Sequence, residues 1–247
     1  MKPVYDLEKL KYGTDAGTYS RAVGLYKKGK VTKVECVAGS YTAIVLGTEP
    51  YRVSVSGRSF KQGHCACYLG QQGTLCKHMI ALALHAVREG KPLAMETTKT
   101  PGEAECSMRA GQLNDMELQK AKLEITNAMK YIKPYRGPSK TWFANQDSLC
   151  EGCARLYDIV HGLPVSKQTS DLLINLLLRL DKKLCTGGVD DSNGTVGGFM
   201  TEVVALLEKY AKIDPACINS FKKLTEIDHT CFGWEADLVR LFDEQPR

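Results

Sequence analysis

Three cysteines and one histidine lie within fourteen residues of this chain and constrain its fold more than any other feature. They are Cys65, Cys67, Cys76 and His78, spaced as C-x-C, eight residues, then C-x-H. Three thiols and an imidazole form a ligand set that closes a tetrahedral structural zinc site. The first pair is expected on one face of a strand, since strand side chains alternate between the two faces. We therefore predict that these four residues bind one Zn²⁺ ion.

The residues around this motif support the prediction. Gly70 and Gly73 permit a tight reversal between the two ligand pairs. A helix is expected to begin near His78, because an apolar pattern at helical spacing follows it and ends at Gly90. In the alternative interpretation the thiols are ordinary buried cysteines, but it requires a chance pairing across a glycine-bearing turn. His64 is excluded as a ligand, since it should point to the opposite face of the strand.

The motif resembles the SWIM zinc finger, whose signature is C-x-C, a variable gap and C-x-H. The resemblance covers roughly residues 15–92 and includes the basic and aromatic approach from Arg21 through Tyr26 to Val31. Family members often carry proline after the second cysteine, where this chain has Tyr68. The later stretch 184–196 is similar to part of the helical domain that follows the finger in some bacterial SWIM proteins. That second likeness implies no activity.

The chain divides into a β-rich part and a helical part. Residues 31–37, 41–47 and 51–56 are strand candidates. Amphipathic helices are expected after Asn114 and over 146–161, 167–184, 196–212, 214–227 and 233–243. The predicted fold is α+β, with a small zinc-stabilised β-β-α SWIM-like module followed by an all-α domain of solenoid or bundle type.

The expected domain limits follow from glycine and proline. Residues 1–92 hold the β-rich region with the finger (core 51–90), residues 93–113 form a connector, and residues 114–247 form the helical domain. The finger module is expected to have a small core. Structural zinc contributes about 10–16 kcal/mol of apparent binding free energy in small modules, so the metal is expected to decide whether this module folds.

The positive charge of the chain is concentrated in its zinc-bearing part. Residues 1–100 carry 15 Lys and Arg against 7 Asp and Glu, a net of +8, whereas the remainder carries 18 against 21, a net of −3. Phosphate contacts are predicted for a basic set comprising Lys27, Lys28, Lys30, Lys61 and Lys77. Under the alternative interpretation these lysines only solubilise the module and protect its sheet edges.

Other motifs carry weaker signals. Cys150 and Cys153 form a C-x-x-C, but the surrounding sequence is helical, so two core cysteines are favoured over a second metal site. The segment 190–194 resembles a calcium loop, yet its glycine comes one position early and Thr201 replaces the required glutamate, which favours a turn. No nucleophile elbow, phosphate loop or H-E-x-x-H motif is present. The chain is therefore expected to be non-enzymatic.

These observations lead to two principal functional hypotheses. Relatives carry SWIM fingers beside chromatin-remodelling-type helicases and Mutator-type transposases, so the resemblance implies an accessory factor that binds DNA. The alternative is a protein–protein interaction adaptor that uses both finger and helical domain, and an enzyme of unrecognised type in the helical part is a third, weaker hypothesis. No secretory signal or membrane span is evident, and ten cysteines without a secreted context indicate reduced thiols, so a cytoplasmic location is expected.

Overall fold

The computed structural model describes residues 2–94 and 105–245, which form two compact units. The N-terminal unit spans Met1–Pro101 and the helical unit spans Gly102–Arg247. Part of the expected connector, residues 95–104, lies outside the described residues. No helix in the described ranges is both long and apolar enough to cross a membrane.

The N-terminal unit is built on a four-stranded antiparallel sheet in the order β1-β2-β3-β4. The strands are β1 (Val31–Val37), β2 (Ser40–Leu46), β3 (Pro50–Ser56) and β4 (Gly63–Cys65). The strand expected for the C-x-C pair is therefore present as β4, but it ends at Cys65. Ala38 and Gly39 both have positive φ and form the two-residue turn between β1 and β2, which suits the right-handed twist of a hairpin. The α+β prediction is confirmed.

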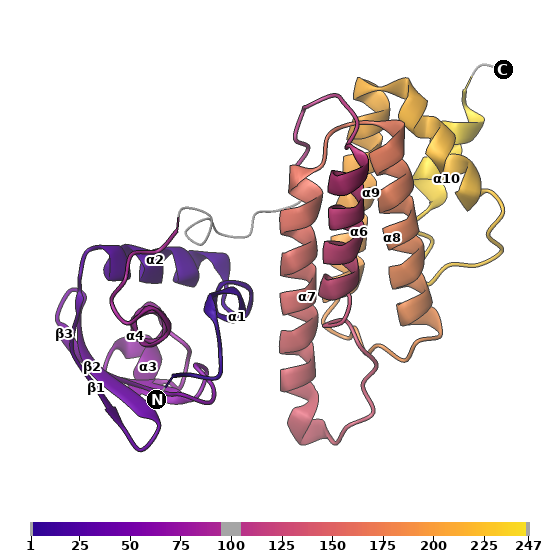
Figure 1. Cartoon of the computed structure of the whole chain (residues 1–247). Helices are drawn as coiled ribbons and strands as arrows, with labels where there is room; N and C mark the ends of the chain where they lie inside the picture. Colours follow the sequence, from indigo (N-terminus) through magenta and orange to yellow (C-terminus); the bar gives the residue numbers. More distant parts are fainter. Residues whose placement is uncertain (1, 95–104, 246–247) are drawn as a thin grey trace. The chain divides into compact units, whose positions relative to one another are not determined.

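Helices cover one face of this sheet. They are α1 (Leu7–Tyr12), α2 (Ala16–Lys27), α3 (Tyr68–Gln71) and α4 (Lys77–Arg88). Figure 1 shows α4 end-on between α2 and the sheet. This position explains why α4 is buried nearly all round from His78 to Leu84.

The expectation of a small core in this unit is wrong. Helices α1 and α2 add Leu10, Tyr19 and Tyr26 to the apolar cluster formed by α4 and the inner face of the sheet. Tyr26 also donates a hydrogen bond of 2.6 Å to the carbonyl of Lys91, beyond the end of α4. From the sequence, residues 21–31 were expected to be a basic and aromatic segment leading into the finger. Most of this segment is instead part of helix α2, which packs into the core.

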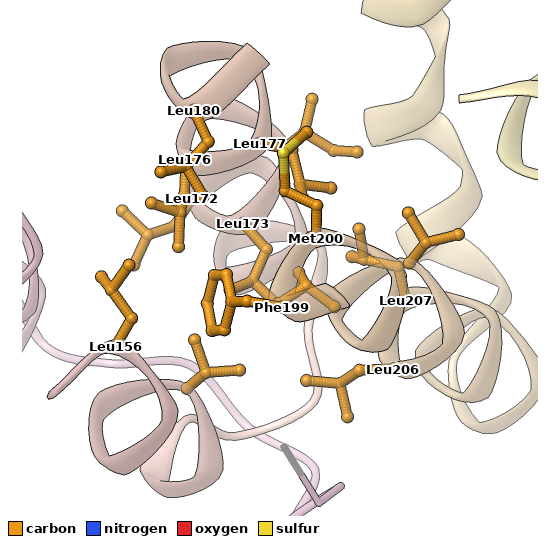
Figure 2. Packing of buried hydrophobic residues seen from close by; sticks show 14 of the residues in the cluster. Leu156, Leu172, Leu173, Leu176, Leu177, Leu180, Phe199, Met200, Leu206 and Leu207 are labelled. Carbon is orange, nitrogen blue, oxygen red and sulfur yellow. The ribbon is translucent and has the colours of Figure 1, made fainter. Parts of the chain in front are cut away.

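The helical unit contains α6 (Asp115–Ala128), α7 (Trp142–Gly162), α8 (Lys167–Cys185), α9 (Thr195–Ile213) and α10 (Ala236–Asp243), with two 3₁₀ segments, η1 (Ser139–Thr141) and η2 (Pro215–Leu224). Its core includes leucines of α8 that pack against Phe199, Met200 and Leu207 of α9 (Figure 2). The segment predicted as a helix over 214–227 is the 3₁₀ segment η2, which begins with Asp214 as N-cap and Pro215 in its first turn.

Part of the expected connector belongs to the helical unit. Ser107 donates a hydrogen bond to the Leu163 carbonyl, and Val165 N–H donates one to the Arg109 carbonyl. Ala110 and Val165 form an isolated parallel bridge. Residues 105–113 therefore lie along the turn between α7 and α8.

Candidate metal centre

Four side chains of the N-terminal unit converge from three elements. We call Cys65, Cys67, Cys76 and His78 the metal cluster; all four are buried, and their ligand atoms lie within 4.8 Å of one another. Cys65 ends β4, whereas Cys67 is the N-cap of α3 and not part of a strand. Cys76 is the N-cap of α4, and His78 lies in its first turn.

The distances within the metal cluster fit a tetrahedral ion. His78 Nδ1 lies 3.7 Å from Cys65 Sγ and 3.9 Å from Cys76 Sγ. A zinc tetrahedron with ordinary bond lengths has sulfur–nitrogen edges of about 3.6 Å and sulfur–sulfur edges of about 3.8 Å. Four protein ligands fill such a tetrahedron, so no coordination position remains for an activated water. A centre of this kind is typical of structural metal sites.

Hydrogen bonds and close packing position Cys65 and Cys67. Cys67 N–H donates to Cys65 Sγ at 3.5 Å, and Gly70 N–H donates to Cys67 Sγ at 3.4 Å. A Cβ atom on Gly70 would lie 2.3 Å from the carbonyl oxygen of Cys65 and 2.5 Å from its Cβ. Only glycine therefore fits at position 70, where α3 crosses the end of β4.

The imidazole of His78 is held by its surroundings. Its ring lies against the ring of Tyr51, with centroids 4.6 Å apart and planes inclined at 34°. Nε2 is buried with no hydrogen-bond partner among the described residues, and a side chain on Gly47 would approach it to 2.7 Å. Nδ1 is thus the nitrogen that faces the sulfurs.

The electrostatics of the metal cluster favour a thiolate at Cys76. A hydrogen bond from Cys65, together with contacts from His78 and the backbone amide of Met79, lowers the pKa of Cys76 despite its burial. Metal binding requires deprotonated thiols, so this arrangement prepares one ligand.

A hollow beside the metal cluster carries two cationic side chains. Thr18, Arg21, Leu69 and Lys77 line it together with Cys67, Cys76 and His78. Arg21 is positioned on α2 by a 3.1 Å hydrogen bond from Nη2 to the Thr18 hydroxyl. The predicted phosphate contacts include Lys77 but not Arg21, and the structure places both side chains at this hollow.

The structure does not gather the whole basic set at this hollow. Lys27, Lys28 and Lys30 are exposed at the C-terminal end of α2. Seven residues of helix separate Arg21 from Lys28, a rise of about 10 Å. Lys61 is exposed between β3 and β4.

The other sequence motifs have structural roles in the described residues. Cys150 Sγ and Cys153 Sγ both lie 3.8 Å from Thr195, and neither belongs to a group of potential metal ligands. Asp191 accepts hydrogen bonds from the backbone amides of Val196 and Gly197 at the start of α9. His64 is exposed on the sheet face that also presents Lys33 and Arg52.

Comparison with known families agrees with this geometry. Residues 51–87 match the family model of the SWIM zinc finger, a range that includes β3, β4, α3, most of α4 and the whole metal cluster. This segment is a SWIM zinc finger. The SWIM finger begins at the strand that carries Tyr51, so the residue that supports the His78 ring lies inside the match. Searches of the curated proteins and of the solved structures give no significant match.

Proposed function

We propose that this protein is a non-enzymatic, cytoplasmic accessory factor that holds Zn²⁺ in its SWIM finger and contacts the phosphate backbone of duplex DNA. One observation carries the DNA hypothesis: Arg21 and Lys77, from two different helices, line one hollow beside the metal cluster. Guanidinium and ammonium groups are the usual partners of backbone phosphates. Contacts of this kind position a duplex without selecting its sequence.

Zinc is the proposed metal because of the donor set. Three sulfurs and one imidazole in a closed tetrahedron are typical of structural zinc sites. The proposal of a non-enzymatic role rests on the same closure, since the centre offers no open position. The cytoplasmic location is supported by the ten cysteines, none of which forms a disulfide in the structure, as is usual in a reducing compartment.

Fluorescence anisotropy of a labelled duplex, measured over a series of salt concentrations, tests the DNA hypothesis. The double variant Arg21→Glu/Lys77→Glu should weaken DNA binding by removing about two phosphate contacts. Each lost contact should make the slope of the logarithm of the binding constant against the logarithm of the salt concentration shallower by about 0.9. Lys27→Glu/Lys28→Glu changes the net charge equally and serves as the matched control at the far end of α2. Zinc content should be unchanged in both variants.

Two outcomes count against this hypothesis. Equal weakening by the two double variants would show that the overall charge, and not the hollow, binds the duplex. Absence of any retention of DNA or RNA at low salt would remove nucleic acid from the proposal.

A protein–protein adaptor is the second candidate function, and one observation favours it. Tyr68 is 74% exposed and Leu69 is 43% exposed on the short helix α3, within the SWIM finger itself. Large apolar side chains at such a position are typical of contact sites for protein partners. Copurification with the tagged protein, with and without nuclease, distinguishes the candidates: a partner that resists nuclease and is lost in Leu69→Asp supports the adaptor.

A further inference from the structure

A second group of potential metal ligands lies in the helical unit, far in sequence from the SWIM finger. Asp181 and Cys185 are one turn apart on α8, and Cys231 lies between η2 and α10. Their ligand atoms are all within 4.8 Å of one another. We call these three residues the second cluster.

The carboxylate of Asp181 is fixed in place by two hydrogen bonds. Its Oδ1 accepts from the backbone amide of Cys231 at 2.8 Å and from the indole Nε1 of Trp234 at 2.9 Å. Asp181 is 9% exposed and Trp234 is 6% exposed, so both groups belong to the interior edge of the unit. A ligand oriented by such outer bonds is a regular feature of metal sites.

The second oxygen of this carboxylate faces a thiol. Asp181 Oδ2 lies 3.6 Å from Cys185 Sγ, close to the sulfur–oxygen edge of about 3.5 Å in a zinc tetrahedron with ordinary bond lengths. Cys185 and Cys231 are exposed, so an ion can reach the sulfurs from solvent.

Among the described residues Asp181 forms no ion pair, so only hydrogen bonds offset the charge of its carboxylate. A buried carboxylate normally has a cationic partner or binds a metal. Two thiols beside it add ligands that become anionic when they bind a cation, and thiolate with carboxylate suits a borderline divalent ion such as Zn²⁺.

We propose that Asp181, Cys185 and Cys231 bind a second divalent zinc ion, with its fourth position open to water. Three protein ligands and an open position distinguish this site from the closed centre of the SWIM finger. The site joins the end of α8 to the segment before α10. It is independent of DNA binding and of the metal cluster.

A disulfide between Cys185 and Cys231 is the competing interpretation. In the structure both thiols are free, and the sulfur of Cys185 faces the Asp181 carboxylate. The three ligand atoms lie close to one another, as one shared ion requires. The zinc stoichiometry of the reduced protein separates the two interpretations.

Equilibrium dialysis of the full chain against Zn²⁺, without oxygen and with a phosphine reductant, tests the proposal. The wild-type protein should bind one more zinc ion than either Cys185→Ser or Cys231→Ser. Cys150→Ser replaces another exposed cysteine of the same unit and should keep the wild-type stoichiometry. Because each comparison is a difference, it does not depend on how much metal the SWIM finger holds.

Asp181→Asn provides a second variant that keeps the hydrogen-bond acceptor for Cys231 and Trp234 but loses the charge. Zinc affinity at the second cluster should fall by about tenfold or more, while circular dichroism stays that of the wild type. Equal zinc stoichiometry in the wild type and both serine variants overturns the proposal. The proposal is also overturned if Cys185 and Cys231 form a disulfide in air and the same protein, once reduced, binds no second zinc.

Discussion

The two units of this chain reach a stable core by different means. The helical unit buries leucines of α8 against α9 (Figure 2). Its apolar core includes residues from α6 through α10. The N-terminal unit packs a single buried helix, α4, between α2 and a four-stranded sheet, and it places metal ligands at the first turn of that helix. The core of one unit is mainly apolar packing, whereas in the other a metal cluster lies at the end of the central element.

Loss of the SWIM finger metal should cause the largest difference in stability between the two units. Cys76→Ser or a strong chelator should destabilise the N-terminal unit by several kcal/mol, because structural zinc contributes about 10–16 kcal/mol of apparent binding free energy. The helical unit should keep its thermal transition, measured by circular dichroism. Cys36→Ser, an exposed cysteine on β1, is the control. Simultaneous melting of both units on chelation would show that they are one cooperative domain.

Truncation of a buried aromatic side chain in the helical unit should lower the stability of that unit only. Phe199 of α9 is fully buried and lies edge-on to Tyr157, with ring centroids 4.8 Å apart. Phe199→Ala should lower the free energy of unfolding of the helical unit by about 3–5 kcal/mol, with zinc content of the SWIM finger unchanged. Phe143, which is 74% exposed, gives the control: Phe143→Ala should change stability by about 0.5 kcal/mol or less. Zinc loss in Phe199→Ala would contradict the separation of the units.

A smaller effect is expected where α3 meets β4. Gly70→Ala should cost about 1–3 kcal/mol in the N-terminal unit and weaken zinc binding, since the added Cβ meets Cys65. Gly24→Ala on α2 has no atom within 4 Å of the new Cβ and should stabilise the helix by about 0.5–1 kcal/mol. Competition with a zinc-sensitive dye gives the affinities. If both variants bind zinc as the wild type does, the close approach at position 70 is unimportant.

The smallest effect concerns a helix end in the helical unit. Asn114 caps α6 in a reciprocal arrangement with Glu117, with both hydrogen bonds at 2.9 Å. Asn114→Ala should reduce the stability of this unit by about 1 kcal/mol, as measured by denaturant unfolding. Asn175→Ala, an exposed position in the interior of α8, should lack this effect. If Asn114→Ala and Asn175→Ala lower the stability of the unit equally, the cap makes no specific contribution.

The sequence was most informative where interacting residues are neighbours along the chain. The metal cluster and the start of α6 after Asn114 were both evident because each depends on residues a few positions apart. The strands over 31–37 and 51–56 were evident for the same reason, since alternation is a local signal. Helix α2 was missed even though Tyr19, Ala22, Val23 and Tyr26 have helical spacing, because their basic neighbours suggested an exposed segment.

Contacts between residues far apart in the chain could not be predicted from the sequence. Cys185 and Cys231 are 46 positions apart, and only the packing of the segment before α10 against α8 brings them together. The pairing of Arg21 with Lys77 depends likewise on the contact between α2 and α4. The 3₁₀ form of η2 was also unpredicted, since apolar spacing does not distinguish it from an α-helix over ten residues.

The spacing of the metal cluster has a consequence for the order of assembly. All four ligands lie between positions 65 and 78, so the ion closes only a short loop and the entropy lost on closure is small. Contacts of low sequence separation form quickly. During synthesis the ligands leave the ribosome well before α8 exists, so the ion can hold the start of α4 while the chain is still growing. The finger therefore needs no part of the helical unit as a template.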